Sequence, residues 1–446
     1  MYVKPRRPSG FQEYTPGEQI AFNRLLTIVR SIYEKYGFSP LDTPDIELTE
    51  VLLAGSGGET SKQVYRFKRE GSDTDLTLRY DLTVPLARYI AEHQHELAFP
   101  FRRYQIGKVH RAERAQAGRF REFYQCDIDV IGSASSIVDA EFPVIINEIF
   151  EQFGFGEFVV RLNNRLILNG VFEGLGLAER SVEVLRIVDK IEKIPVEVFE
   201  AELRELGLSD EQVGRLQAFL SISGTNDEIL AQLDGMSADM PESFNEGVRL
   251  LRAVVVALRQ MSMPEHRFAI DLHIARGLDY YTGTVYETFL VDHPGLGSVC
   301  SGGRYDNLTK HYMNGDFPGV GISIGLSRLF YKLREVGAIE ASSQSPAQVM
   351  VLPVSDSDDD VAYGIRVAAA LRDSGLSVLL RADAGSVGKG LKYADKLGFV
   401  NVVLVGETER LANKVTLKNM TTGEAALVDV GDVSGVVGVG IGAGAQ

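Results

Sequence analysis

The sequence of 446 residues is poor in cysteine, with only Cys126 and Cys300. Two cysteines cannot form a disulfide framework, and a structural zinc site is disfavoured because tetrahedral zinc takes four Cys or His ligands. The seven histidines also lack metal-ligand spacing, such as two His separated by three residues on a helix. The sequence therefore predicts no metal site made by the protein alone, and it fits a protein of the reducing cytoplasm.

Long apolar runs and an excess of basic residues are absent as well. No apolar run is long enough for a membrane-spanning helix, and the N-terminal stretch MYVKPRRPSGFQEYTP lacks the apolar core of a secretion signal. We therefore expect a protein that neither crosses a membrane nor is secreted. The net charge of −15 argues against a general affinity for polyanions, although a local basic patch can still bind phosphates.

What the chain does have is enough apolar residues, 45%, for two or three domains with cores of their own. A capping-box pattern at residues 15–18 begins a predicted helix that ends at Gly37, and strand-like runs then continue to about residue 132. The pattern is nearly all helical from about 166 to 261 and strand-like again afterwards. This texture predicts an α+β core that contains a helical insertion.

A serine-rich linker at residues 341–346 precedes alternating strands and helices, which predict a small α/β domain with a parallel sheet. The Gly/Val/Ala tail is predicted to be poorly ordered. The predicted parts are 1–165 (core, first part), 166–261 (helical insertion), 262–340 (core, second part), 341–346 (linker), 347–432 (α/β domain) and 433–446 (flexible tail).

The most basic stretch is residues 102–121, which holds seven Lys and Arg against the single acid Glu113. Guanidinium groups bind phosphate oxygens in bidentate geometry, so the arginines around the loop AQAG are candidates for phosphate binding. They are Arg111, Arg114, Arg119 and Arg121. A hairpin with arginines on its solvated surface is the alternative.

Polar side chains alternate with apolar ones along two predicted strands. In EFYQCDIDVIG, residues 122–132, Gln125 and Asp129 fall on one face, and in LTLRYDLT the same period places Asp81 and Thr83 together. These acceptors would suit an ammonium group and N–H donors. A sheet with one side in solvent would show the same alternation, so both interpretations stay open at this point.

Two further segments resemble the signature sequences of histidyl-tRNA synthetases, namely RGLDYYTGTVYE (276–287) and SGGRYDNL (301–308). The resemblance extends along nearly the whole chain in the order of the family. YGFSPLDTPDIE is similar to motif 1 of class II synthetases, RAERAQAGRFREFYQCDID to motif 2 and GVGISIGLSRL to motif 3. The resemblance implies a class II catalytic domain built on an antiparallel sheet with a helical insertion, followed by a C-terminal α/β anticodon-binding domain.

The resemblance also implies an enzyme, a ligase of histidine and tRNA. ATP and L-histidine would form histidyl-adenylate with release of pyrophosphate, and the histidyl group would then pass to tRNA(His) with release of AMP. Mg²⁺ would accompany the ATP. Because motif 1 builds a dimer interface in this class, we also expect a homodimer.

Residue roles follow from the resemblance alone. Arg111 and Arg276 take the catalytic places at the α-phosphate, while Arg328 meets the γ-phosphate and Glu113 lies by the adenine. Ala115 and Gln116 occupy the loop that approaches the tRNA acceptor end. The implied histidine-binding residues are Asp81, Thr83 and Gln125 at the α-amino group, Asp129, Tyr280 and Tyr281 at the imidazole, Arg111 near the carboxylate, and Arg276.

Three other functions are possible for such a sequence. One is the regulatory subunit that resembles these synthetases and partners ATP phosphoribosyltransferase, but such relatives generally lack the extra C-terminal domain. A class II synthetase for another amino acid is disfavoured by the acid and phenol assigned to the imidazole. An RNA-binding module without chemistry would bind RNA but would not exchange pyrophosphate into ATP.

Overall fold

The computed structural model describes residues 2–54, 60–114, 118–191, 193–274, 281–312, 315, 317–339, 341, 343–381 and 386–442. The chain divides into two compact units, one of Met1–Gln12 and Thr27–Ala338 and one of Glu13–Leu26 and Ile339–Gln446. Within the described ranges, no helix is both long and apolar enough to span a membrane.

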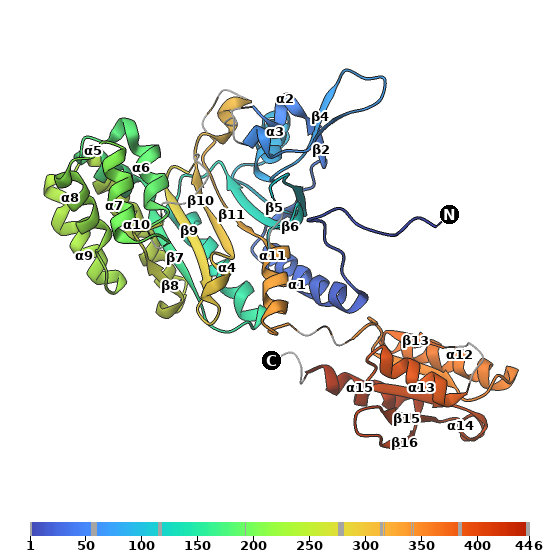
Figure 1. Cartoon of the computed structure of the whole chain (residues 1–446). Helices are drawn as coiled ribbons and strands as arrows, with labels where there is room; N and C mark the ends of the chain where they lie inside the picture. Colours follow the sequence, from blue (N-terminus) through green and yellow to red (C-terminus); the bar gives the residue numbers. More distant parts are fainter. Residues whose placement is uncertain are drawn as a thin grey trace. The chain divides into compact units, whose positions relative to one another are not determined.

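An eight-stranded sheet forms the centre of the first unit (Figure 1). Its strands, in spatial order, are β1 (Ser39–Pro40), β5 (Phe101–His110), β6 (Glu122–Ile131), β11 (Gly319–Ile324), β10 (Cys300–Tyr305), β9 (Thr284–Leu290), β7 (Phe158–Asn164) and β8 (Phe268–Ile270). Among the described strand pairs of this sheet, only the outermost, β1 with β5 and β7 with β8, are parallel. The predicted antiparallel sheet is therefore confirmed.

Three helices, α1 (Pro16–Lys35), α4 (Ser136–Phe153) and α11 (Leu326–Glu335), are connected to this sheet. α1 begins where the backbone N–H of Thr15 donates to Glu18 Oε2 at 2.6 Å, as its capping pattern predicts. α4 starts at the N-cap Ser135 and ends at Gly154, whose φ is +70°. α11 directly follows β11, and Tyr33 of α1 donates to the carbonyl oxygen of Cys126 on β6.

The helical insertion lies at the β7–β8 edge of the sheet (Figure 1). Two of its helices begin with complete capping boxes, at Ser209 with Gln212 and at Thr225 with Glu228. This confirms the helical texture that the sequence shows there. The insertion comprises α5 (Arg165–Gly174), α6 (Ser181–Val188), α7 (Val196–Glu205), α8 (Asp210–Leu220), α9 (Asn226–Met236) and α10 (Glu242–Gln260).

One predicted strand is wrong in its extent. In a small sheet of β2 (Ile46–Leu48), β4 (Asp75–Leu78) and β3 (Arg66–Lys68), strand β4 ends at Leu78, and Thr83 already begins the helix α3 (Thr83–His93). A short helix, α2 (Thr49–Leu52), follows β2. Asp81 accepts the N–H of Val84 at 3.1 Å, so its carboxylate satisfies a donor at the start of α3. The alternation of polar and apolar residues predicts that the strand continues through Thr83, but α3 begins at that residue.

The second unit contains the predicted α/β domain. Its sheet has the order β13 (Val378–Leu380), β12 (Val349–Pro353), β14 (Asn401–Val405), β15 (Val415–Asn419) and β16 (Ala425–Val428), with the first three parallel and the last two a hairpin. Its helices are α12 (Asp358–Asp373), α13 (Val387–Lys396), α14 (Glu407–Ala412) and α15 (Val433–Gly442). α15 lies where a flexible tail is predicted, because Val433 and Val437 pack into the apolar core of this domain.

Candidate active site

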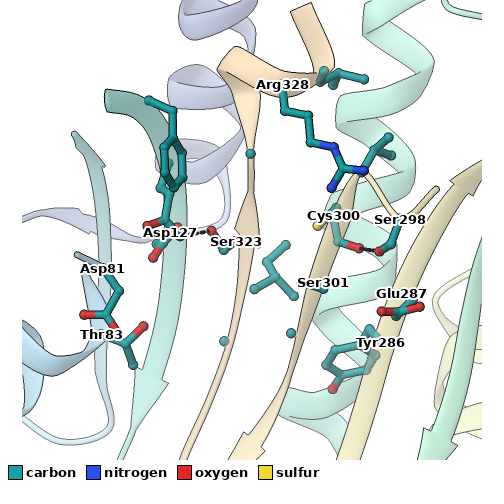
Figure 2. Close-up of a pocket in the computed structure, with 18 of the residues that line it drawn as sticks. Asp81, Thr83, Asp127, Tyr286, Glu287, Ser298, Cys300, Ser301, Ser323 and Arg328 are labelled. Carbon is teal, nitrogen blue, oxygen red and sulfur yellow. Dashed lines mark hydrogen bonds between the residues drawn. The ribbon is translucent and has the colours of Figure 1, made fainter. Parts of the chain in front are cut away.

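A cavity of about 550 Å³ opens on one face of the eight-stranded sheet (Figure 2). It collects side chains from β6, β9, β10 and β11, from the start of α3 and from the first turns of α11. Asp81 and Thr83 lie on one side of it and Arg328 on the other (Figure 2). Segments from distant parts of the sequence therefore share one chamber.

The floor of the cavity is set by strand register. One row across the sheet pairs Asp129 with Gly321 and Gly321 with Gly303, and the next row runs from Asp127 through Ser323 and Ser301 to Glu287. The glycine at 321 is required, because a Cβ there would overlap Asp129 Oδ1. The missing side chain lets the Asp129 carboxylate lie over β11.

The Asp129 carboxylate contacts a side chain on each side. Arg103 on β5 places its Nη2 atom 2.7 Å from Asp129 Oδ2, and the Tyr305 hydroxyl donates to Asp129 Oδ1 at 2.5 Å. Burial raises the pKa of this carboxyl group above its ordinary value, while Arg103 and the Tyr305 hydrogen bond pull the pKa down. The cation and the phenol thus oppose the cost of a buried charge.

Two more carboxyl groups face the same chamber. Burial raises the pKa of Asp127 to about 7, against the attraction of Arg103 and with a further increase from Asp129. Burial also raises the pKa of Asp81 to about 6, although the Val84 N–H and the Arg111 charge lower it. These three acids share the buried cation Arg103, and together they form an electronegative pocket that suits a cationic ligand.

Basic and aromatic side chains also line the cavity. Arg111 donates from Nε to the carbonyl oxygen of Tyr80 at 3.1 Å, and its guanidinium lies 5.2 Å from the ring centroid of Phe123. Arg328 donates from Nη2 to the carbonyl oxygen of Leu296 at 3.0 Å. Further lining residues on the wall are Glu113, Arg119, Phe120 and Lys332. Arginines beside an aromatic face can hold phosphates and a stacked base.

Ser327 fixes the start of α11. Its buried hydroxyl accepts the backbone N–H of Tyr124 at 2.9 Å and so joins the helix to β6. Arg328, the next residue, is therefore carried by a helix that is tied directly to the strand bearing Gln125.

Most of the predicted site residues meet in this cavity. Those lining it are Asp81, Thr83, Arg111, Glu113, Gln125, Asp129, Tyr281 and Arg328. Arg276, Tyr280, Ala115 and Gln116 lie outside the described residues. Arg114 and Arg121 of the basic stretch are not among the lining residues, and Arg121 instead donates to the carbonyl oxygen of Glu113 at 3.0 Å.

Several lining residues were not predicted. Asp127 shares the polar face of β6 with Gln125 and Asp129 by the period of two, but neither the alternation nor the family resemblance gives it a role. Tyr305, Ser301, Ser323 and Glu287 also line the cavity. Ser301 and Tyr305 belong to SGGRYDNL, so that segment was a usable signal, whereas the place of Ser323 depends on its register opposite Asp127.

Comparison with known proteins agrees with this architecture. The family profile for histidyl-tRNA synthetase matches residues 10–329, and that for the anticodon binding domain matches residues 348–438. The chain is 52% identical to a histidine–tRNA ligase of Clostridium tetani over 424 residues, covering 94% of this chain and 95% of that protein. A histidine–tRNA ligase of Xanthomonas oryzae is 46% identical over 444 residues, covering 94% of each.

The solved structures include a close match. The crystal structure of histidyl-tRNA synthetase from Nostoc sp. PCC 7120 superposes with a TM-score of 0.91 at 40% identity, covering 98% of this chain and 99% of that one. Sequence and fold agree over nearly the full length, and the chain belongs to the histidyl-tRNA synthetase family.

Proposed function

We propose that this protein joins L-histidine to tRNA(His) in two steps, with ATP as the energy source and histidyl-adenylate as the intermediate. The observation that carries the proposal is one cavity lined both by acceptors for an amino acid and by guanidinium groups for a nucleotide. Family membership supports the same reaction.

The acidic side of the cavity suits histidine. A carboxylate such as Asp129 accepts a ring N–H, and a phenol hydroxyl such as that of Tyr281 can serve the other ring nitrogen. Asp81, Thr83 and Gln125 supply acceptors for the α-ammonium group. A pocket that hydrogen-bonds a ring N–H rejects amino acids without it by roughly 10⁴ to 10⁵, so no editing step is needed.

The guanidinium groups of the cavity suit ATP. In the proposed first step the histidine carboxylate attacks the α-phosphorus and pyrophosphate leaves, so negative charge builds at the α-phosphate. Arg111 and Arg276 are placed by resemblance to stabilise that charge, and Arg328 to hold the γ-phosphate. Fixed cations of this kind act by positioning and by preorganised electrostatics, without covalent help from the protein.

Mg²⁺ is proposed to enter with ATP. Among the described residues no group of three or more His, Cys, Asp or Glu could hold a metal ion. Mg²⁺ in nucleotide sites is commonly held by one or two carboxylates together with the phosphates, and Glu287 is a carboxylate on the cavity wall. The residues therefore fit an ion that is shared with ATP, where it would neutralise phosphate charge.

The partners follow from the two units. The anticodon-binding domain supports tRNA(His) as the nucleic acid substrate, and Ala115 and Gln116 are proposed to meet its acceptor end. We also propose a homodimer through the motif 1 region, which size-exclusion chromatography with light scattering would test. The cytoplasmic location stays a prediction from the low cysteine content.

Histidine-dependent exchange of pyrophosphate into ATP tests the adenylation step. Exchange with histidine alone among the amino acids is expected, and Arg276→Ala should lower kcat by roughly 10²- to 10³-fold, as the loss of one transition-state donor does. Arg249→Ala is the matched control, because Arg249 is exposed on α10 and pairs with Glu246. No exchange from folded protein would contradict the proposal and favour the regulatory relative.

A further inference from the structure

Arg103 is the largest fully buried side chain described, with 0% of its surface exposed. It lies on β5 directly opposite Asp129 in the strand register, yet it is not among the residues that line the cavity. Burying a guanidinium is costly unless it is paired, so its position calls for a reason beyond filling space.

One nitrogen of Arg103 joins the two halves of the amino-acid pocket. Its Nη2 atom is 2.7 Å from Asp129 Oδ2 and donates to the carbonyl oxygen of Leu82 at 3.2 Å. Leu82 stands between Asp81 and Thr83, so this contact fixes the turn that carries both. The guanidinium therefore links the proposed ring acceptor on β6 to the proposed ammonium acceptors before α3.

Asp129 still has capacity for a ligand in this arrangement. Its carboxylate offers about four lone-pair sites, and the Tyr305 hydroxyl occupies one of them. Oδ2 lies 2.7 Å from Arg103 Nη2 but accepts no hydrogen bond from the described residues. A carboxylate held by two strands on either side keeps one orientation, whereas a single contact would leave it free to rotate.

We propose that Arg103 is a positioning residue for histidine, which acts through Asp129 and the Leu82 carbonyl and sets the distance between the two halves of the amino-acid pocket. This inference rests on the proposed function. Arg103 does not line the cavity, and its effect should be specific to histidine because Asp129 and Leu82 belong to the amino-acid part of the site.

Charge gives Arg103 a second effect that can be measured. The titratable and charged groups around Asp129 are Arg103 on β5, Asp127 on β6, Tyr305 on β10, Tyr33 on α1, and Asp81 and Tyr281 beyond them. Arg103 lowers the pKa of Asp129, so its removal raises that pKa. Only the ionised carboxylate accepts the imidazole N–H without competition from its own proton. As the pH falls, the variant should therefore lose histidine affinity at a higher pH than the unchanged protein does.

The test is the pH dependence of KM for histidine in pyrophosphate exchange, with active enzyme counted by its burst of adenylate. Arg103→Gln should raise KM for histidine by about tenfold to a hundredfold at pH 7, the usual cost of losing an orienting partner, and leave KM for ATP within about twofold. The increase should be larger at pH 6 than at pH 8.5. Arg103→Lys keeps the charge, so it should raise KM for histidine with the pH profile of the unchanged protein.

Arg304→Gln is the matched control. Arg304 is a second buried arginine of the same sheet, paired with Asp139 and outside the lining of the cavity. This variant should lose stability without any pH-dependent change in KM for histidine. The proposal is overturned if Arg103→Gln behaves like this control, or, where that variant does not fold, if Arg103→Lys keeps the unchanged KM for histidine. Absence of exchange in the unchanged protein would instead count against the proposed function.

Discussion

At the scale of single residues, the unusual feature is the concentration of buried acid in the amino-acid pocket. Asp81, Asp127 and Asp129 are only 4%, 2% and 3% exposed, and burial raises the pKa of each. A protein tolerates such a cost where a ligand brings the missing positive charge, as the α-ammonium of an amino acid does. Stability without ligand and affinity for ligand are therefore opposed in this pocket.

Asp127→Asn should separate these two effects. The pKa of Asp127 is about 7 in the folded state against an ordinary 3.8, so its protonated form favours folding below about pH 4 and that contribution is lost as the pH rises through 7. Asparagine imitates the protonated group at every pH. Without ligand the variant should gain about 1 to 3 kcal/mol of unfolding free energy over the unchanged protein at pH 8, and little at pH 4.

Urea unfolding at the two pH values measures this gain. Asp234→Asn, at a position 56% exposed on α9, is the control and should show no such pH dependence. An Asp127→Asn protein less stable than the unchanged one at pH 8 would contradict the account of a buried carboxylate whose charge Arg103 offsets only in part.

At the scale of elements, the pocket depends on neighbouring strands that differ in side-chain size. β6 supplies the large polar groups, and β11 supplies Gly321 opposite Asp129, so the carboxylate can cross over the neighbouring strand. Register matters as much as composition here, because a slip of one residue would turn the polar face of β6 away from the cavity.

Gly321→Ala should damage histidine binding selectively. The new Cβ would overlap Asp129 Oδ1 and lie 2.6 Å from the carbonyl oxygen of Ile128, so the Asp129 carboxylate must leave its place between Arg103 and Tyr305. We expect KM for histidine to rise at least about tenfold, with a loss of about 1 to 3 kcal/mol of stability from overpacking.

The control is Gly235→Ala in α9, where the added Cβ meets no heavy atom within 4 Å apart from the adjacent residues and the backbone of its own helix. Alanine is favoured over glycine in a helix by about 0.5 to 1 kcal/mol, so this variant should be more stable and should keep its KM for histidine. Pyrophosphate-exchange kinetics measure KM for histidine in both variants, and urea unfolding midpoints measure their stability. An unchanged KM for histidine in Gly321→Ala would show that the Asp129 position is not needed.

The limits of sequence-based prediction also appear at this scale. The polar face of β6 follows from a period of two, and that face does line the cavity. The same period fails at Asp81 and Thr83, because a helix begins there and the side chain of Asp81 serves its first turn. Arg103 offered no signal within the basic stretch, since its role depends on a register partner that lies on another strand, β6.

At the scale of the whole molecule, the order of helical and strand-like patterns along the sequence predicts the architecture well. The helical insertion and the α/β domain both follow from periodicity, because each is built from local elements with regular apolar spacing. The pairing order of the central sheet could not be predicted in this way. β11 lies between β6 and β10 although the whole helical insertion separates it from β6 in the sequence, and nothing local specifies that neighbour.

Two separate cores lead to a prediction about unfolding. The pocket belongs to the first unit, whereas the core around Val349, Val403 and Val415 belongs to the second. We therefore expect two calorimetric transitions, of which only one moves with ligand. L-histidinol with ATP is the suitable ligand pair, because histidinol lacks the carboxylate and cannot be adenylated. At a free concentration about 100 times Kd, each should stabilise the first unit by about 2.7 kcal/mol.

Val403→Ala identifies the other transition. Val403 is fully buried in the core of the second unit, and truncating it leaves a cavity that should cost about 2 kcal/mol there. The transition lowered by this variant should be the one that histidinol and ATP leave in place. If a single transition instead responds to both the ligands and the core variant, the two units unfold as one cooperative body, and ligand binding in the first unit stabilises the anticodon-binding domain as well.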